Sequence, residues 1–315
     1  MKKQTPAKTV AVLGISGYVG QHLMRYLEHD GGWNVVGIDI NAPMFSPPGL
    51  KYYQLDVRQD YLTEIFTREQ VDVVVHLAFL LKHPDNRLMR EINVDGTGNV
   101  MKAATEAGVQ KVILTTSTAV YGANRDNPPA LTEEMPLRGH PNFPYVRNQL
   151  AVEELAAGFA AQHQTPSITV LRPCVIYGRR TSSFLLDFLR SAPVLPLLNG
   201  ENPKLQFIHV EDLVRAIVLS MEKDVSGAFN IVSRDTIFYS QVADYMGKKT
   251  VYVPSKAAYI VAETAHLLGY AENLPPYVLD FIWRRWVADG SKAERELEFK
   301  AKYTSIEALA SMLKK

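Results

Sequence analysis

The stretch VLGISGYVGQHLMRYL, residues 12–27, decides the fold. Gly14, Gly17 and Gly20 separate an apolar run from an amphipathic helical pattern. Glycines at such a junction permit a tight turn and close approach of a pyrophosphate, which the N–H groups of the helix N-terminus attract. Asp39 follows 19 residues after Gly20, at the end of the next apolar run, where a carboxylate can bind ribose hydroxyls. The stretch therefore predicts a strand, a dinucleotide-binding turn and a helix.

The alternation of apolar runs and helical patterns continues through the first two thirds of the chain. Runs rich in Val, Ile and Leu predict buried strands at Thr9–Gly14, Asn34–Asp39, Val71–Ala78, Lys111–Ser117, Ser167–Pro173 and Gly227–Ser233. Helical patterns lie near Gln21–His29, Leu62–Arg68, Arg87–Ala107 and Tyr145–His163. This order predicts an α/β fold with a Rossmann-like, doubly wound parallel sheet and helices on both faces.

The pattern loosens after about residue 173. We expect a dinucleotide-binding Rossmann domain over residues 1–173, with strand contributions from about 205–233, and a smaller, mostly helical substrate lobe over 174–315. No long linker separates the two, so a tight cleft is expected at the carboxyl edge of the sheet.

Composition favours a small-molecule partner. The chain has 315 residues and a net charge of +1 from 34 basic and 33 acidic residues, so it has no overall field to attract nucleic acid. Cys174 is the only cysteine and is expected to be a buried, inert thiol. His76 and His209 are expected to be hydrogen-bonded core groups, and no metal site is predicted.

A membrane span is not expected. The longest apolar helical candidate, Lys256–Tyr270, includes charged residues and falls short of the ~20 residues that cross a bilayer. No signal-peptide pattern is evident at the N-terminus, and we expect a cytoplasmic protein. A weaker hypothesis is peripheral membrane association through the apolar C-terminal helices.

Eight ordered motifs give the chain a family resemblance. The G-x-x-G-x-x-G spacing resembles the short-chain dehydrogenase/reductase superfamily, and seven further motifs narrow the resemblance to its extended branch, the NAD-dependent epimerase/dehydratase family. They are LDV (55–57), VVHLAF (74–79), NVDGTGNVMKAA (93–104), TTSTAVYG (115–122), LRPCVIYG (171–178), LQFIHVEDLVRAI (205–217) and SKAERELEF (291–299).

The resemblance implies hydride transfer at a nicotinamide. Tyr145 would take or give the proton of a hydroxyl, and Ser117 would hydrogen-bond the same oxygen; by the residues alone, Ser117 could instead cap a turn and Tyr145 pack against the sheet. The cofactor-binding residues that it implies are Gly14, Gly17, Tyr18, Val19, Gly20, Asp39, Asp56, Val57, Leu77, Ala78, Asn93, Thr115, Tyr145 and Pro173. No basic residue follows Asp39 in DINAPMFSPP, so NAD is favoured over NADP.

Gln149 departs from the family pattern, which has a lysine at this catalytic position. A lysine ammonium ~4 Å from Tyr145 would favour the phenolate by roughly 4 kcal/mol. Gln149 can hydrogen-bond a ribose but has no charge. Arg147 faces another side of the helix, and Lys82, in the loop after the Val71–Ala78 strand, is the cation that could reach the cofactor.

The substrate side also departs from the family. Nucleotide-sugar relatives hold a diphosphate with an asparagine and an arginine at the positions of Val175 and Leu205, both apolar here. Apolar and aromatic residues are also frequent in Phe79–Asn86 and Pro276–Val287, where Trp283 and Trp286 are expected to pack rather than bind.

The first hypothesis is therefore an NAD-dependent oxidoreductase or epimerase acting on a hydroxy or keto group of a small molecule other than a standard nucleotide-diphosphate sugar. The alternative is a catalytically impaired NAD(P)-binding sensor or scaffold. The resemblance also implies a homodimer, formed through the helices near 87–107 and 145–163.

Overall fold

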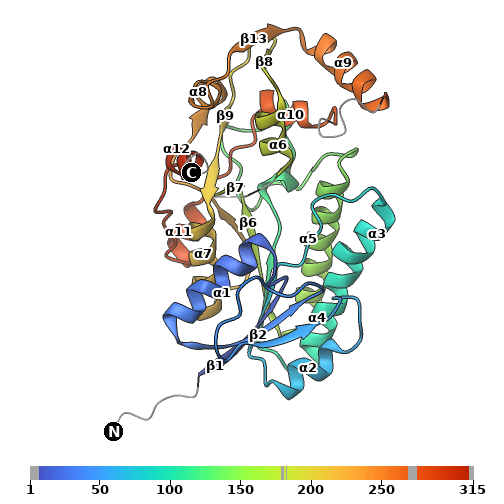
Figure 1. Ribbon diagram of the computed structural model, residues 1–315, viewed down its shortest axis with the longest axis vertical. Coiled ribbons are helices and arrows are strands. Elements are labelled where there is room, and N and C mark those ends of the chain that lie inside the picture. The colour runs from blue at the N-terminus through green and yellow to red at the C-terminus, as the bar shows by residue number, and fades with distance from the viewer. Residues whose placement is uncertain (1–6, 179–180, 182, 269–274, 312–315) are drawn as a thin grey trace.

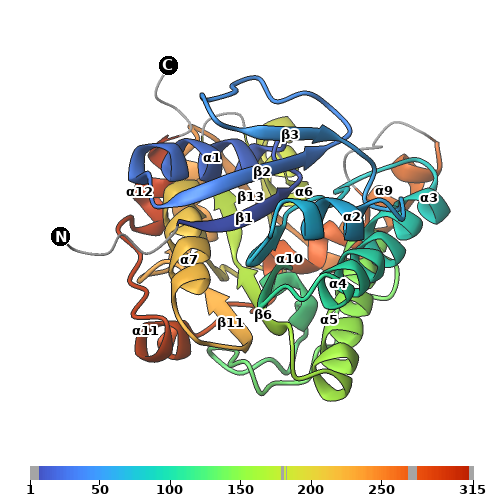
Figure 2. The same cartoon turned by 90° about the horizontal axis from the view of Figure 1, so that it is seen from below.

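The computed structural model describes residues 7–178, 181, 183–268 and 275–311. Its central sheet has seven strands: β1 (Lys8–Leu13), β2 (Trp33–Asp39), β3 (Lys51–Gln54), β4 (Val73–His76), β5 (Lys111–Thr115), β6 (Ser167–Pro173) and β11 (Gly227–Ile231). All pairs are parallel, and the order across the sheet is β11-β6-β5-β4-β1-β2-β3 (Figures 1 and 2). The predicted doubly wound parallel sheet is confirmed.

Helices cover both faces of this sheet. They are α1 (Tyr18–Asp30), α2 (Leu62–Arg68), α3 (Asn86–Arg90), the π-helix η1 (Glu91–Asp95), α4 (Gly96–Glu106), the 3₁₀-helix η2 (Thr118–Tyr121), α5 (Pro144–Gln162) and α7 (Val210–Glu222). Val10 and Val12 pack on the side of α1 and α7, whereas Ala11 and Leu13 pack on the side of α2, α4 and α5. Successive strand residues point to opposite faces, so both faces of β1 are apolar.

The helix predicted over Arg87–Ala107 divides into α3, η1 and α4. The chain widens into a π-helix at Glu91–Asp95, which contains the buried Asn93. Such π-bulges occur mostly within α-helices and often at functional sites.

The remaining elements, which we call the C-terminal lobe, lie mostly in the upper half of Figure 1. They are β7 (Val175–Tyr177), α6 (Phe184–Ser191), β8 (Leu195–Leu198), β9 (Lys204–Leu205), β10 (Phe207–His209), β12 (Ile237–Phe238), α8 (Tyr239–Tyr245), β13 (Thr250–Val253), α9 (Ser255–Leu267), α10 (Val278–Trp283), α11 (Ser291–Glu296) and α12 (Ser305–Ser311). Six short strands, paired as β10-β7, β12-β9 and β13-β8, accompany the expected helices. Helix α11 lies beside β11 of the main sheet (Figures 1 and 2).

The predicted division at residue 173 stays a prediction. Of the segment 205–233, β11 joins the main sheet, whereas β10 pairs with β7 in the lobe. The apolar candidate helix Lys256–Tyr270 is α9, which ends at Leu267; Gly269 and Tyr270 lie outside the described residues. Within the described ranges, no helix has the length and hydropathy to cross a membrane.

Strands β1 and β4 are neighbours although α1, β2, β3 and α2 separate them in the chain. The connections from these two strands therefore run to opposite sides, which makes this position the switch point of the sheet. Ligands of open α/β sheets bind at the carboxyl ends of the strands at such a point.

Candidate active site

A cavity of about 490 Å³ lies at this switch point, between the carboxyl edge of the sheet and the C-terminal lobe. Its wall comes from the turn after β1, the loops after β4, β5 and β6, the start of α5, and residues of α6 and the segment before α10. Eleven of the residues expected at the site line it: Gly14, Gly17, Tyr18, Val19, Gly20, Leu77, Thr115, Ser117, Tyr145, Gln149 and Pro173.

The glycine turn leaves room that a side chain would fill. A Cβ on Gly14, which has a φ of 83°, would lie 2.5 Å from the backbone nitrogen of Ala78. Gly17 precedes α1 as its N-cap, and neither a side-chain cap nor an acidic residue occupies the first turn of the helix. The N–H groups of that turn are therefore available to an anion, as a dinucleotide pyrophosphate requires.

Asp39 fixes the position of this turn. Its carboxylate accepts hydrogen bonds from the backbone N–H groups of Ser16 and Asn41, each at 3.0 Å. Asp39 does not line the cavity itself. A carboxylate oxygen has more than one acceptor site, so Asp39 can still accept a ribose hydroxyl.

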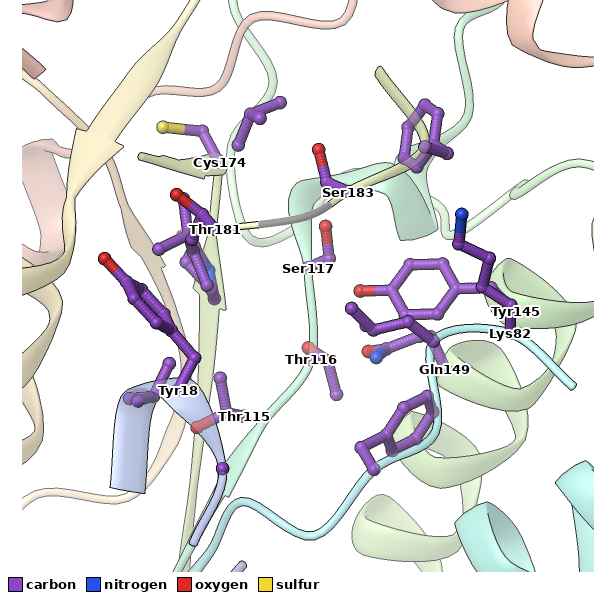
Figure 3. A pocket seen from close by; sticks show the side chains of 18 of the residues that line it. Tyr18, Lys82, Thr115, Thr116, Ser117, Tyr145, Gln149, Cys174, Thr181 and Ser183 are labelled. Atoms are coloured by element: carbon purple, nitrogen blue, oxygen red, sulfur yellow. The ribbon is translucent and has the colours of Figure 1, made fainter. Parts of the chain in front are cut away.

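Ser117 and Tyr145 meet on one wall of the cavity (Figure 3). Ser117 is the N-cap of η2, where its hydroxyl accepts a hydrogen bond from the N–H of Ala119 at 3.2 Å. The hydroxyl thus caps a turn and also faces the phenol. Burial raises the pKa of Tyr145 to about 12, and a hydrogen bond with Ser117 opposes that rise.

Gln149 lies one helical turn after Tyr145, with its carboxamide beside the phenol ring (Figure 3). Its side chain is 2% exposed, and its Oε1 has no hydrogen-bond partner among the described residues. The hydroxyl oxygen of Thr115, another lining residue, is also buried without one. A buried polar atom without a partner costs ~1–3 kcal/mol, so these atoms indicate a ligand with hydroxyl groups.

Lys82 is not a free cation at this site. Its ammonium group forms a 2.6 Å ion pair with Asp187 of α6. These two are the charged side chains of the described cavity lining, and they neutralise each other. Arg147 is exposed on α5 and lies outside the lining, as expected.

A buried ion pair behind Ser117 was missed by sequence reasoning. Arg172 of β6 donates two hydrogen bonds to Glu153 of α5, at 2.8 and 2.9 Å, and both side chains are buried. Glu153 also accepts the hydroxyl of Thr116 at 2.7 Å. The pair therefore joins α5 to the ends of β5 and β6, and Thr116 links it to the segment that carries Ser117.

Much of the remaining cavity wall is apolar and aromatic. Phe143 stacks on Tyr277 with ring centres 4.2 Å apart, and Phe79 meets the ring of Tyr145 edge-on at 5.7 Å. Phe184 and Trp286 extend this wall, as do Val175 and Cys174. Burial raises the pKa of the Cys174 thiol well above its ordinary value, so it stays protonated, as expected for an inert thiol.

Trp283 and Trp286 both pack against neighbouring side chains, as expected. Trp286 is 5% exposed and its indole N–H donates to Phe281 O at 3.0 Å, although it also lines the cavity, whereas Trp283 lies outside the lining. Leu205 does not face the cavity, because it is buried in β9 opposite Ile237 of β12.

Besides Asp39, four expected cofactor residues lie outside the cavity lining. The Asn93 carboxamide bonds the backbone N–H and C=O of Leu80, at 2.7 and 2.9 Å, and so holds the loop after β4. Asp56 is paired with Arg58. Val57 packs against Gly96, where a Cβ would meet it at 2.7 Å. Ala78 contributes its backbone, against Gly14.

The two histidines lie apart from any metal-binding group. His76 Nε2 is 3.0 Å from the Thr97 hydroxyl, and burial lowers the pKa of His76 to about 4. His209 caps α7 by accepting from the N–H of Glu211 at 3.2 Å. The described residues contain no group of three or more His, Cys, Asp and Glu that could hold a metal ion.

Comparisons with known proteins extend this description. The model of the NAD dependent epimerase/dehydratase family matches residues 10–232. N-acetyl-alpha-D-glucosaminyl-diphospho-ditrans,octacis-undecaprenol 4-epimerase of Escherichia coli O157:H7 is 32% identical over 248 residues, which cover 74% of this chain and 70% of that protein. The decarboxylating sterol-4-alpha-carboxylate 3-dehydrogenase of Homo sapiens is 29% identical over 226 residues, or 70% and 59% of the two chains.

A solved structure shares the whole fold. MoeE5 in complex with UDP-glucuronic acid and NAD has a TM-score of 0.73 and 25% identity to this chain, with 96% of this chain and 97% of that one covered.

Proposed function

The chain belongs to the NAD-dependent epimerase/dehydratase family, and we propose that it transfers hydride between NAD and a hydroxy or keto carbon of a small molecule with an apolar body. The observation that carries the proposal is the cavity itself. It joins a glycine turn suited to a pyrophosphate, the Ser117–Tyr145 pair and an aromatic wall in one space.

Each residue has a defined role in this proposal. The bound dinucleotide would supply a nicotinamide that accepts or returns hydride. Tyr145 would remove the hydroxyl proton of the substrate as hydride leaves, or donate it in the reverse direction, and Ser117 would hold the same oxygen. Gln149 and Thr115 would bind hydroxyl groups of the cofactor through their unpartnered oxygens.

We propose NAD rather than NADP as the cofactor. The Asp39 carboxylate would repel a 2′-phosphate, and no basic residue follows it in residues 40–48. Asp39→Asn removes the charge and keeps one acceptor oxygen, so it can still accept from Ser16 or from Asn41 but not from both. Its NADP affinity should rise about tenfold relative to NAD, or roughly 1.4 kcal/mol. An unchanged ratio would contradict the role of Asp39.

The substrate is proposed to be less polar than a nucleotide-diphosphate sugar. Support comes from Val175 and the aromatic wall, and from the balanced Lys82–Asp187 pair, which leaves no net positive charge in the described lining. The named relatives differ in substrate polarity, since one is a sterol dehydrogenase and another a sugar-diphospholipid epimerase.

The test is NADH formation with a panel of apolar alcohols and, in parallel, UDP-glucose and UDP-glucuronic acid. We expect turnover with an apolar alcohol and its loss in Tyr145→Phe and Ser117→Ala. Preference for a UDP-sugar would overturn the substrate class but not the reaction. Full turnover in Tyr145→Phe would overturn the reaction.

A second candidate function is a dinucleotide-binding sensor or scaffold with impaired catalysis. The neutral Gln149 favours it, because no described side chain supplies the charge that would ionise Tyr145. Tight NAD binding without turnover, in wild type and in Gln149→Lys, would support this candidate. A homodimer through α4 and α5 also stays a prediction, which sedimentation velocity can test.

A further inference from the structure

Helix α9 turns mostly small side chains toward the protein and its larger aliphatic side chains toward solvent. Its inner face consists of Ala258, Tyr259, Ala262 and Ala265, of which Ala262 is the one fully buried residue of the helix. Its larger aliphatic side chains point outward instead. Ile260, Val261 and Leu267 are 64%, 67% and 84% exposed, and Leu268, directly after the helix, is 64% exposed.

These outward residues form one stripe. Ile260 and Leu267 are seven residues apart, as are Val261 and Leu268, which places each pair on the same side of a helix. Ala257 and Thr264 lie on the same side of α9 and are also exposed. We call these six residues the α9 surface.

The α9 surface lies at the end of the molecule farthest from β1 and β2 (Figure 1). Its inner face is firmly held, because Tyr259 donates a hydrogen bond of 2.8 Å to Asp280 of α10. Asn199 also fixes the start of α9, by bonding the hydroxyl and the backbone N–H of Ser255. The outward direction of the stripe is therefore set by contacts, and other described residues leave it uncovered.

The charges around this surface are mainly positive. Residues 246–268 contain three lysines and one carboxylate, that of Glu263. Lys248 is used internally, since its ammonium group bonds the carbonyls of Arg190 and Ala192 at 2.8 and 2.6 Å. Lys249 and Lys256 are exposed and form no ion pair within the described part of the chain. A partner that covers the stripe would meet these two ammonium groups and the exposed carboxylate of Glu263, which lies on the same side of α9 as Lys256, so the net charge is +1.

We propose that the α9 surface docks on the headgroup layer of an anionic lipid bilayer. Helices that lie in a membrane interface bury an apolar face and keep lysines at the level of the headgroups, where anionic lipids attract them. The stripe supplies the apolar face, and Lys249 and Lys256 supply the cations.

A second copy of the chain fits this surface less well. A 13-residue helix is about 20 Å long and about 10 Å wide, so its outer face presents on the order of 200 Å². A stable dimer buries about 800 Å² per partner. Binding to a bilayer needs no minimum area of this kind, because the insertion of a few apolar side chains and the attraction of lysines to anionic lipids together give reversible binding.

Helix α9 is linked to the cavity wall through α10. Tyr277, which lines the cavity, directly precedes α10, and α10 is bonded to α9 through Asp280 and Tyr259. Docking would hold the cavity near the bilayer, where apolar alcohols accumulate. This consequence rests on the proposed function, whereas the docking itself does not.

The experiment is co-sedimentation of the full chain with phosphatidylcholine vesicles and with vesicles of equal parts phosphatidylcholine and phosphatidylglycerol. We expect binding to the anionic vesicles, at least tenfold weaker in the double variant Ile260→Glu, Leu267→Glu. The matched control is Ile306→Glu, an exposed aliphatic residue of α12, which should bind as wild type does. Dinucleotide binding by tryptophan fluorescence checks that each variant is folded.

The contribution of the two lysines to vesicle binding is tested separately. Lys249→Gln and Lys256→Gln should each weaken binding to anionic vesicles by about fivefold. The proposal would be overturned if the chain did not bind anionic vesicles, or if the double variant and the Ile306 control lost binding equally. It would also be overturned if the wild type were a dimer that did not bind vesicles and that the double substitution dissociated. Equal binding to both vesicle types would overturn the role assigned to the lysines. A failed activity assay would affect none of these readouts.

Discussion

Glu153 of α5 holds Arg172 of β6 through two hydrogen bonds, of 2.8 and 2.9 Å, and also accepts the hydroxyl of Thr116, the residue before Ser117. Arg172 also donates to the hydroxyl of Tyr121 at 2.8 Å, and that hydroxyl donates to Asn230 at 2.8 Å. One buried network therefore ties α5, β6, η2 and β11 together around the candidate site.

Glu153→Gln should destabilise the fold strongly. The substitution leaves the Arg172 guanidinium buried without its counter-charge, and breaking a buried pair in this way costs about 3–5 kcal/mol. Urea unfolding followed by circular dichroism measures the loss. The matched control is Asp126→Asn, which breaks the largely exposed pair with Arg138 and should cost less than about 1 kcal/mol. Equal losses in the two variants would contradict this account.

Gln149→Lys should increase alcohol oxidation at neutral pH. In the wild type, burial holds the pKa of Tyr145 near 12, so the reactive phenolate is scarce and the rate should rise with pH across the neutral range. An ammonium group one helical turn away favours the phenolate and lowers that pKa. The rate should then reach its plateau at a lower pH than in the wild type. At neutral pH it should be about 10²-fold higher than the wild-type rate.

The control for this prediction is Gln149→Met, which has a similar size but neither charge nor a hydrogen-bonding amide. It should weaken dinucleotide binding, because Gln149 no longer offers its acceptor, and leave the shape of the pH–rate profile unchanged. A wild-type profile that is flat over the neutral range would argue against Tyr145 as the proton acceptor.

Lys82→Met should leave the pH dependence of the rate unchanged. Lys82 is paired with Asp187 at 2.6 Å and is largely exposed, so it neither supplies a free charge to Tyr145 nor contributes more than about 1 kcal/mol to stability. The profile and the urea midpoint are the two measurements. Movement of the profile to higher pH in this variant would identify Lys82 as the cation that replaces the family lysine.

The parts of the fold that sequence reasoning predicted are those with strong local patterns. Strands such as β1 and β6 are apolar on both faces. The glycine turn is identified by three glycines within the seven residues 14–20. β3 was missed because KYYQ, at the sheet edge, is short and only partly buried. The lobe strands of two to four residues are too short to show a period.

The candidate site was harder to predict where it depends on contacts between distant segments. Glu153 and Arg172 are 19 residues apart, and nothing in either local sequence indicates that they pair. The orientation of Leu205 depends on its register against β12, which the sequence does not specify. Asn93 matched its motif, yet its bonds to Leu80 depend on where the loop after β4 runs.

Gly14→Ala should abolish dinucleotide binding and lower stability by more than backbone strain alone. The control is Gly49→Ala, because Gly49 has a similar φ of 89° but nothing within 4 Å of its added Cβ, whereas the Cβ at position 14 would lie 2.5 Å from Ala78 N. Both variants carry the ~1–2 kcal/mol cost of a left-handed alanine. The difference between them in urea unfolding and in NADH fluorescence titration therefore isolates the close approach of β1 to the loop after β4. Equal stability and equal NADH affinity in the two variants would show that this close approach does not shape the cofactor site.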